Sequence, residues 1–233
     1  MAAKVKELST SFYNDYVVHG FKYNLQVLPD TLTSATILFS LLFQSSPFAV
    51  LATALVALQF IHKGMASFAG TYLPGMEYRP PDSEKCSGRF PGVSYNTVMS
   101  MVGRPDGYTE HDGWPSYYAT FMGFLTGWMG VLPTLYSKEL TASPAKGKAV
   151  KAGFVGLVLL TAIVWIYRIT SECESFFSVS MGLLAGFAIG VAGVLLAAWA
   201  TDRRATNLLG LPLIRNKAAD GKPIYVCERP ADA

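Results

Sequence analysis

Three short segments of this chain contain residue types that can bind an anion: Arg79-Pro80, Pro115-Ser116 and Arg168. Ser116 stands at the expected start of a helix, where unpaired backbone N–H groups and the helix dipole attract negative charge. An arginine adds a fork of N–H donors that matches two phosphate oxygens. The segments are therefore candidates for a phosphate-binding site. From these residues alone the sequence favours the other interpretation, in which each arginine caps a helix or meets a lipid headgroup.

The order and spacing of these segments resemble the type 2 phosphatidic acid phosphatase superfamily. That family has a lysine separated by six residues from Arg-Pro, then Pro-Ser-Gly-His, then an arginine followed by a histidine and an aspartate. Arg79, Ser116 and Arg168 match the family pattern. At the four positions where the family has lysine, histidine, histidine and aspartate, this chain has Tyr72, Tyr118, Glu174 and Ser178.

These departures bear on catalysis. In the family, the third-motif histidine attacks phosphorus, and the second-motif histidine protonates the leaving group. A nucleophile needs a group that activates it, and proton transfer needs a group that titrates near the working pH. Glu174, Ser178 and Tyr118 supply neither in the family's manner. The resemblance therefore implies a pseudophosphatase with no catalytic residues, no cofactor and no metal.

The elements that would position these residues are apolar segments without Asp, Glu, Lys or Arg. They are Thr31–Ile61, Pro115–Tyr136, Ala152–Tyr167 and Phe176–Ala200. A helix needs roughly 20 apolar residues to cross a bilayer. The sequence therefore predicts an all-α integral membrane bundle with four transmembrane helices. Its expected parts are a polar N-terminal segment (1–30), the bundle (31–200) with an outer loop (64–114), and an extended C-terminal tail (201–233).

The first apolar segment leaves the number of crossings open. It contains Ser45-Ser46-Pro47, which is typical of a helix N-cap followed by the first helical positions. A break there would give helices Thr31–Gln44 and Pro47–Ala69 and five crossings. One long helix with a proline kink would give four. The sequence favours four, because 14 residues are fewer than a spanning helix needs.

The charges predict an orientation. If the first segment crosses once, the side with both termini has 13 Lys and Arg, and the other side has 6. The positive-inside rule then places both termini on the inner side. Cys86 and Cys173 fall on the outer side, where they can form a disulfide if that compartment is oxidising. The sequence favours three free thiols, with Cys227 as the third.

The last apolar segment carries small residues at every fourth position: Ser178, Gly182, Gly186 and Gly190. This spacing places them on one helix face, which another helix can approach closely. Gly123 and Gly127 repeat the spacing. The face predicts either packing within the bundle, which we favour, or a seam between copies of the chain.

The sequence favours a non-catalytic structural subunit of a larger membrane assembly. Its partners would be membrane lipid and other protein subunits. Nucleic acid is not expected, because no patch combines basic and aromatic residues. The alternative is a lipid-phosphate phosphatase or lipid-phosphate-binding protein that uses Arg79, Ser116 and Arg168. A transporter or channel ranks last, because the apolar segments contain no charged residue.

Overall fold

A computed structural model describes residues 19–73, 86, 114–201, 203–211, 213–217 and 223–226. These residues form seven α-helices, one 3-10 helix and a two-stranded sheet. In chain order they are α2 (His19–Gln26), α3 (Leu28–Leu42), α4 (Ser46–Tyr72), α7 (Tyr117–Leu135), α8 (Ser137–Ala142), α9 (Pro144–Thr170), α10 (Phe176–Ala200), η2 (Arg203–Thr206), β1 (Leu213–Lys217) and β2 (Pro223–Val226).

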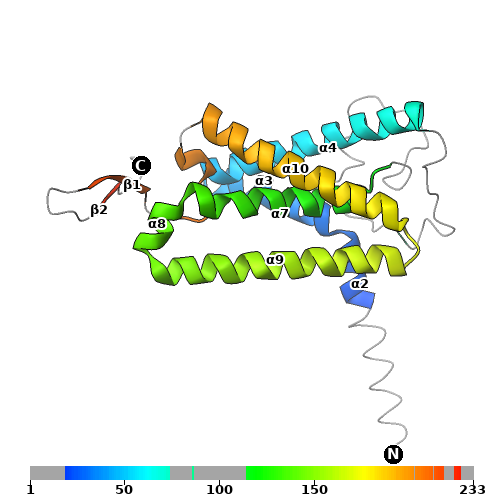
Figure 1. Cartoon of the computed structure of the whole chain (residues 1–233), viewed down its shortest axis with the longest axis horizontal. Coiled ribbons are helices and arrows are strands. Elements are labelled where there is room, and N and C mark those ends of the chain that lie inside the picture. Colours follow the sequence, from blue (N-terminus) through cyan, green and yellow to red (C-terminus); the bar gives the residue numbers. More distant parts are fainter. Residues whose placement is uncertain are drawn as a thin grey trace, which may run out of the picture.

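The long helices lie side by side and alternate in direction along the chain (Figure 1). The central helix is α7, which packs closely on α10 and also contacts α9, α4 and α3. The aromatic residues of α7 supply much of the buried core, including Tyr117, Phe121, Phe124 and Trp128. The core is therefore built around the helix that follows Pro115-Ser116.

The predicted first span is two helices. Helix α3 ends at Leu42 and α4 begins at Ser46. Between them, Gln44 has a φ of 46°, a left-handed conformation that a continuing helix does not contain. Ser45 is extended, and Pro47 lies in the first turn of α4, where its missing N–H costs no helical hydrogen bond. The favoured prediction of one continuous helix is wrong, and the structure has the break near Ser45 that the sequence left open as the alternative.

Three helices are long and apolar enough to cross a membrane: α4, α9 and α10. The pair α2 and α3, bent by 66°, makes a fourth if it counts as one span. Helix α7 was expected as a span, but it is not among the helices of the described residues that are apolar enough to cross. Its tyrosine, threonine and glycine residues lower its mean hydropathy. The structure thus supports a helical membrane protein with three or four candidate spans, whereas the sequence predicted four or five.

The small residues of α10 face α7. A Cβ added to Gly182, Gly186 or Gly190 would overlap the backbone carbonyl oxygen of Ser116, Thr120 or Phe124, respectively. A Cβ added to Gly123 or Gly127 of α7 would in turn overlap the carbonyl oxygens of Leu183 and Phe187. We call these five glycines the glycine ladder. It packs α7 against α10, as favoured, so this face is not available as a seam between copies.

The tail segment contains a short antiparallel sheet in which Leu213 pairs with Val226 and Lys217 with Pro223. It lies at the end of the bundle that holds α8 (Figure 1). The Nζ of Lys146 in α9 donates to the carbonyl oxygen of Gly210 at 3.0 Å. We call this the tail end.

The opposite end of the bundle holds α2, and we call it the disulfide end after the Cys86–Cys173 bond described below. The Gln26 side chain of α2 donates to the hydroxyl of Tyr167 at 3.3 Å, near the end of α9. The described parts of the N-terminal segment and of the tail thus lie at opposite ends of the bundle (Figure 1). The structure does not support the prediction that both share one side, because the break near Ser45 adds a helix that reverses the chain.

Candidate functional site

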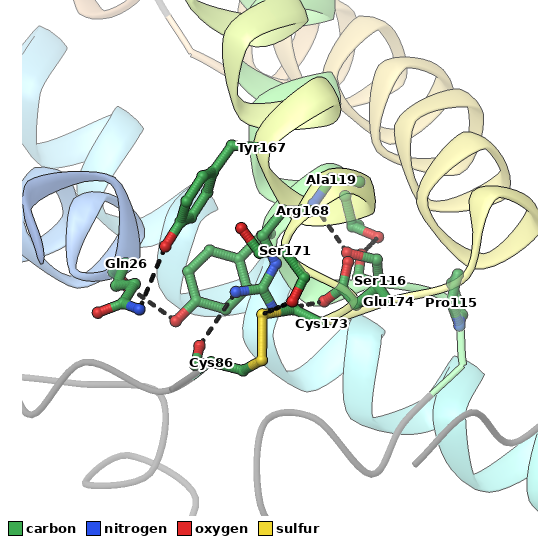
Figure 2. Close-up of polar contacts among 12 residues, drawn as sticks. Gln26, Cys86, Pro115, Ser116, Ala119, Tyr167, Arg168, Ser171, Cys173 and Glu174 are labelled. Carbon is green, nitrogen blue, oxygen red and sulfur yellow. Dashed lines mark hydrogen bonds and ion pairs between the residues drawn. A yellow bond between two sulfur atoms is a disulfide. The ribbon is translucent and has the colours of Figure 1, made fainter. Parts of the chain in front are cut away.

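Arg168, the third-motif arginine, is enclosed by groups of this chain. It lies in the last turn of α9, and its side chain is 1% exposed. Its Nη2 is 2.8 Å from the Oε1 of Glu174, which is 8% exposed, and its Nη1 donates to the carbonyl oxygen of Cys86 at 3.1 Å (Figure 2). Its guanidinium carbon lies 4.0 Å from the ring centroid of Tyr118. We call Arg168, Glu174, Tyr118 and Cys86 the arginine cluster.

The cluster brings together two of the positions where the chain departs from the phosphatase motifs. Glu174 stands where the family has its nucleophilic histidine, and Tyr118 stands where the family has the acid. The carboxylate of Glu174 neutralises the arginine, and the ring of Tyr118 covers one face of the guanidinium. A phosphate would have to displace a buried carboxylate to reach Arg168, and the two anions would repel each other.

The disulfide joins Cys86 to Cys173, and the two residues are 87 positions apart in the chain. This is the pairing that the sequence left open beside the favoured free thiols, and the free-thiol prediction is wrong for these two. The bond holds the carbonyl of Cys86 against Arg168 and ties it to the link between α9 and α10 (Figure 2). The third cysteine, Cys227, lies outside the described residues.

Ser116 caps α7. Its Oγ accepts a hydrogen bond from the Ala119 N–H at 3.2 Å, as expected for an N-cap. Its own N–H donates to the carbonyl oxygen of Ser178 at 3.2 Å, which places it beside the first turn of α10. Ser116 lies at the same end of the bundle as Arg168 (Figure 2). Because it is only 1% exposed, it is not open to a ligand from solvent.

The remaining predicted positions fall in three places. Tyr72 lies in the last turn of α4 and is exposed, with its ring against Phe68. Ser178 is buried on α10, and its N–H donates to the Oγ of Ser175. Arg79 lies outside the described residues. The structure therefore brings Ser116, Tyr118, Arg168, Glu174 and Ser178 to one end, whereas Tyr72 is exposed and contacts Phe68.

Helix α2 closes the cluster from a third side. The hydroxyl of Tyr118 donates to the carbonyl oxygen of Gln26 at 2.7 Å. The Gln26 side chain donates in turn to Tyr167, the neighbour of Arg168 (Figure 2). No role was predicted for the residues of α2, because this short polar stretch carries no signal for the contact.

His62 is a second residue that sequence reasoning assigned no function. It lies in α4, and its Nε2 is 2.7 Å from the carbonyl oxygen of Pro115. Its ring meets that of Tyr117 edge-on, with centroids 5.2 Å apart. The predicted helix Pro47–Ala69 already placed His62 in its last third. Its partner at the start of α7 is 53 residues away and was not visible in the sequence.

No group of three or more metal-ligating side chains occurs within the described ranges. No family model, curated protein or solved structure matches the chain. The phosphatase resemblance therefore stays a prediction that rests on the short motifs.

Proposed function

We propose that this protein is a non-catalytic structural subunit of a membrane assembly, with a phosphatase-like motif set that no longer binds phosphate. One observation carries the proposal. Arg168, the arginine that would hold the substrate, is buried and already engaged by Glu174, Tyr118 and the carbonyl of Cys86. The cluster ties α9, the start of α7 and the α9–α10 link together, which is a structural role.

The surface of α9 supports a role in assembly. Only 11% of its most apolar stretch is buried within the chain, and Val155, Leu159 and Ile166 are each more than half exposed. Helices α9 and α10 leave a groove of about 390 Å³ between them, with Gly123 and Thr126 of α7 among its lining residues. Such a surface suits either lipid or the helix of another subunit.

Two features support an orientation in the membrane. Disulfides persist in oxidising compartments, so the disulfide end would face the outer or lumenal side. At the tail end, Lys138, Lys146, Lys148 and Lys151 lie in or just before the first turns of α9. The positive-inside rule places such residues on the cytoplasmic side. The two features agree, so only the described part of the N-terminal segment (19–30) changes sides relative to the sequence prediction.

A hydrolysis assay tests the loss of catalysis. The purified protein is incubated in detergent with a phosphatidic acid and with a water-soluble phosphate ester, and released phosphate is measured. We expect no release above that of a matched preparation without the protein. Turnover that is abolished both in Arg168→Ala and in the milder variant Ser116→Ala would overturn the proposal in favour of a lipid-phosphate phosphatase.

Photo-crosslinking in the native membrane tests the assembly. A photoreactive side chain is placed at Leu159, which is 60% exposed, and, as the matched control, at Val164, which is 2% exposed on the same helix. We expect Leu159 to give a protein adduct of discrete mass and Val164 to give none. Lipid adducts alone at Leu159, Val155 and Ile166 would show that α9 faces lipid and would remove the support that α9 gives to assembly.

Labelling with a membrane-impermeant maleimide tests the orientation. Single cysteines are introduced by Thr170→Cys at the disulfide end and Ala145→Cys at the tail end, both in a Cys227→Ser background. Both positions are exposed. In intact cells we expect labelling at position 170 only, and at position 145 only after permeabilisation. The reverse pattern would invert the proposed orientation.

A further inference from the structure

The tail end of the bundle is strongly basic. The residues whose side chains are described there (137–151, 201 and 204–211) contain five Lys or Arg and one Glu. The basic residues whose side chains the structure describes here are Lys138, Lys146, Lys148, Lys151 and Arg204. The single acid is Glu139, which is buried. We call this set of cations the basic collar.

The lysines of the collar lie in α8 and at the start of α9, and they do not converge on one point. Lys146, Lys148 and Lys151 are exposed. Lys148 and Lys151 are three residues apart and share a helix face, whereas Lys146 and Lys148 are two apart and point to different sides. Lys146 reaches the tail through its hydrogen bond to Gly210. This arrangement suits an extended charged surface better than a single bound ion.

The collar lies at the level where headgroups would meet the bundle. The apolar part of α9 begins directly after Lys151. At the same end, Trp199 in the last turn of α10 is 86% exposed, and exposed tryptophans are typical of the membrane–water interface.

The disulfide end is different. Its described ranges contain Lys22, Lys63 and Arg168 against Asp30, Glu172 and Glu174. These charges balance, and Arg168 is already engaged by Glu174.

We propose that the basic collar binds the anionic headgroups of one membrane leaflet and enriches acidic phospholipids around the tail end. The inference rests on the proposed membrane orientation, because the cytoplasmic leaflet is the one that carries anionic lipid. Each lysine near such a surface strengthens association by about fivefold, and the attraction falls off within the Debye length, about 10 Å at 0.1 M salt.

Spin-labelled lipids measure this enrichment directly. The full-length protein is reconstituted in phosphatidylcholine vesicles with trace spin-labelled phosphatidylserine or phosphatidylcholine, and the motionally restricted fraction of each label is recorded. At 0.1 M salt we expect phosphatidylserine to associate several-fold more strongly than phosphatidylcholine. In 1 M salt we expect the two lipids to associate about equally. The variant Lys148→Gln/Lys151→Gln should lower the preference several-fold. The matched control Lys22→Gln/Lys63→Gln should leave most of it.

Three outcomes would overturn the inference: equal association of both lipids at 0.1 M salt, a preference that survives 1 M salt, or a preference that Lys148→Gln/Lys151→Gln leaves unchanged. Salt-sensitive binding of heparin without a lipid preference would assign the collar to a soluble anionic partner and would also overturn it. Extraction with alkaline carbonate separates the two proposals. Protein that stays in the vesicle membrane without a lipid preference refutes the collar alone, whereas protein that is extracted refutes the membrane role itself.

Discussion

Helices α9 and α10 are consecutive, similarly long and similarly apolar, yet they are held in different ways. The glycine ladder brings the backbone of α10 against that of α7 from Gly182 to Gly190. The buried residues of α9, in contrast, are Thr161, Val164 and Arg168, all in its last ten positions. Thus α10 is fixed along much of its length by backbone contact, and α9 is fixed near one end by side chains.

The glycines of the two helices explain part of this difference. A Cβ on Gly186 would overlap the backbone of Thr120, whereas a Cβ on Gly153 or Gly156 of α9 would meet nothing within 4 Å. Apolar content therefore identifies a candidate span, but it does not determine how tightly that span packs. Close packing needs small residues that recur on one face and a partner helix that matches them.

The attachment of α9 at Arg168 should be the most costly to remove. Arg168→Ala leaves the carboxylate of Glu174 buried without its cation, and we expect the free energy of unfolding in detergent to fall by about 3–5 kcal/mol. Denaturant titration measures this loss. The double variant Arg168→Leu/Glu174→Leu removes both charges and should recover most of it. If the single and double variants are equally unstable, the ion pair is not what holds the end of α9.

The disulfide supports the same end of α9 from outside the helix. Cys173→Ser should lower the free energy of unfolding by about 2–4 kcal/mol, because the unfolded chain is no longer cross-linked over 87 residues. The melting temperature with and without reductant measures the effect. The control Cys227→Ser should melt as the parent does and remain sensitive to reductant. A parent protein whose melting ignores reductant would contradict this prediction.

The glycine ladder offers a matched pair of substitutions. Gly186→Ala forces α7 and α10 apart, and we expect a loss of about 1–3 kcal/mol, which is typical of overpacking. Gly156→Ala adds the same methyl group to an open surface and should be neutral or slightly stabilising, since alanine favours a helix. Thermal unfolding of both variants in the same detergent compares them. Equal effects would mean that α10 is not held by close backbone approach.

The contact between α9 and the tail should matter least. The hydrogen bond from Lys146 to the carbonyl of Gly210 is exposed, so Lys146→Gln should change the free energy of unfolding by less than about 0.5 kcal/mol. Limited proteolysis provides a second measurement, because a loosened tail is cleaved faster. A loss comparable with that of Gly186→Ala would show that the tail end of α9 is anchored and would weaken the comparison with α10.

Several features of the fold were predictable from the sequence because they depend on neighbouring residues. The stretches without charge predict the long helices, and Ser45-Ser46-Pro47 carries the signal for the break before α4, although the sequence favoured one kinked helix there. The serine at 116 predicts the N-cap of α7. The four-residue spacing predicts the face of α10 that packs closely. Each follows from local backbone preference or helical periodicity, which are properties of short segments.

The partners of those features required the tertiary structure. The sequence presented Arg168 as an anion-binding residue, because an isolated arginine near a helix end has that chemistry. Only the fold shows that Glu174, Tyr118 and the carbonyl of Cys86 already surround it. The same holds for the Cys86–Cys173 bond and for the opposite ends at which α2 and the tail lie. Contacts between distant residues depend on how whole helices pack, so a short motif specifies the chemistry of a side chain but not what it meets.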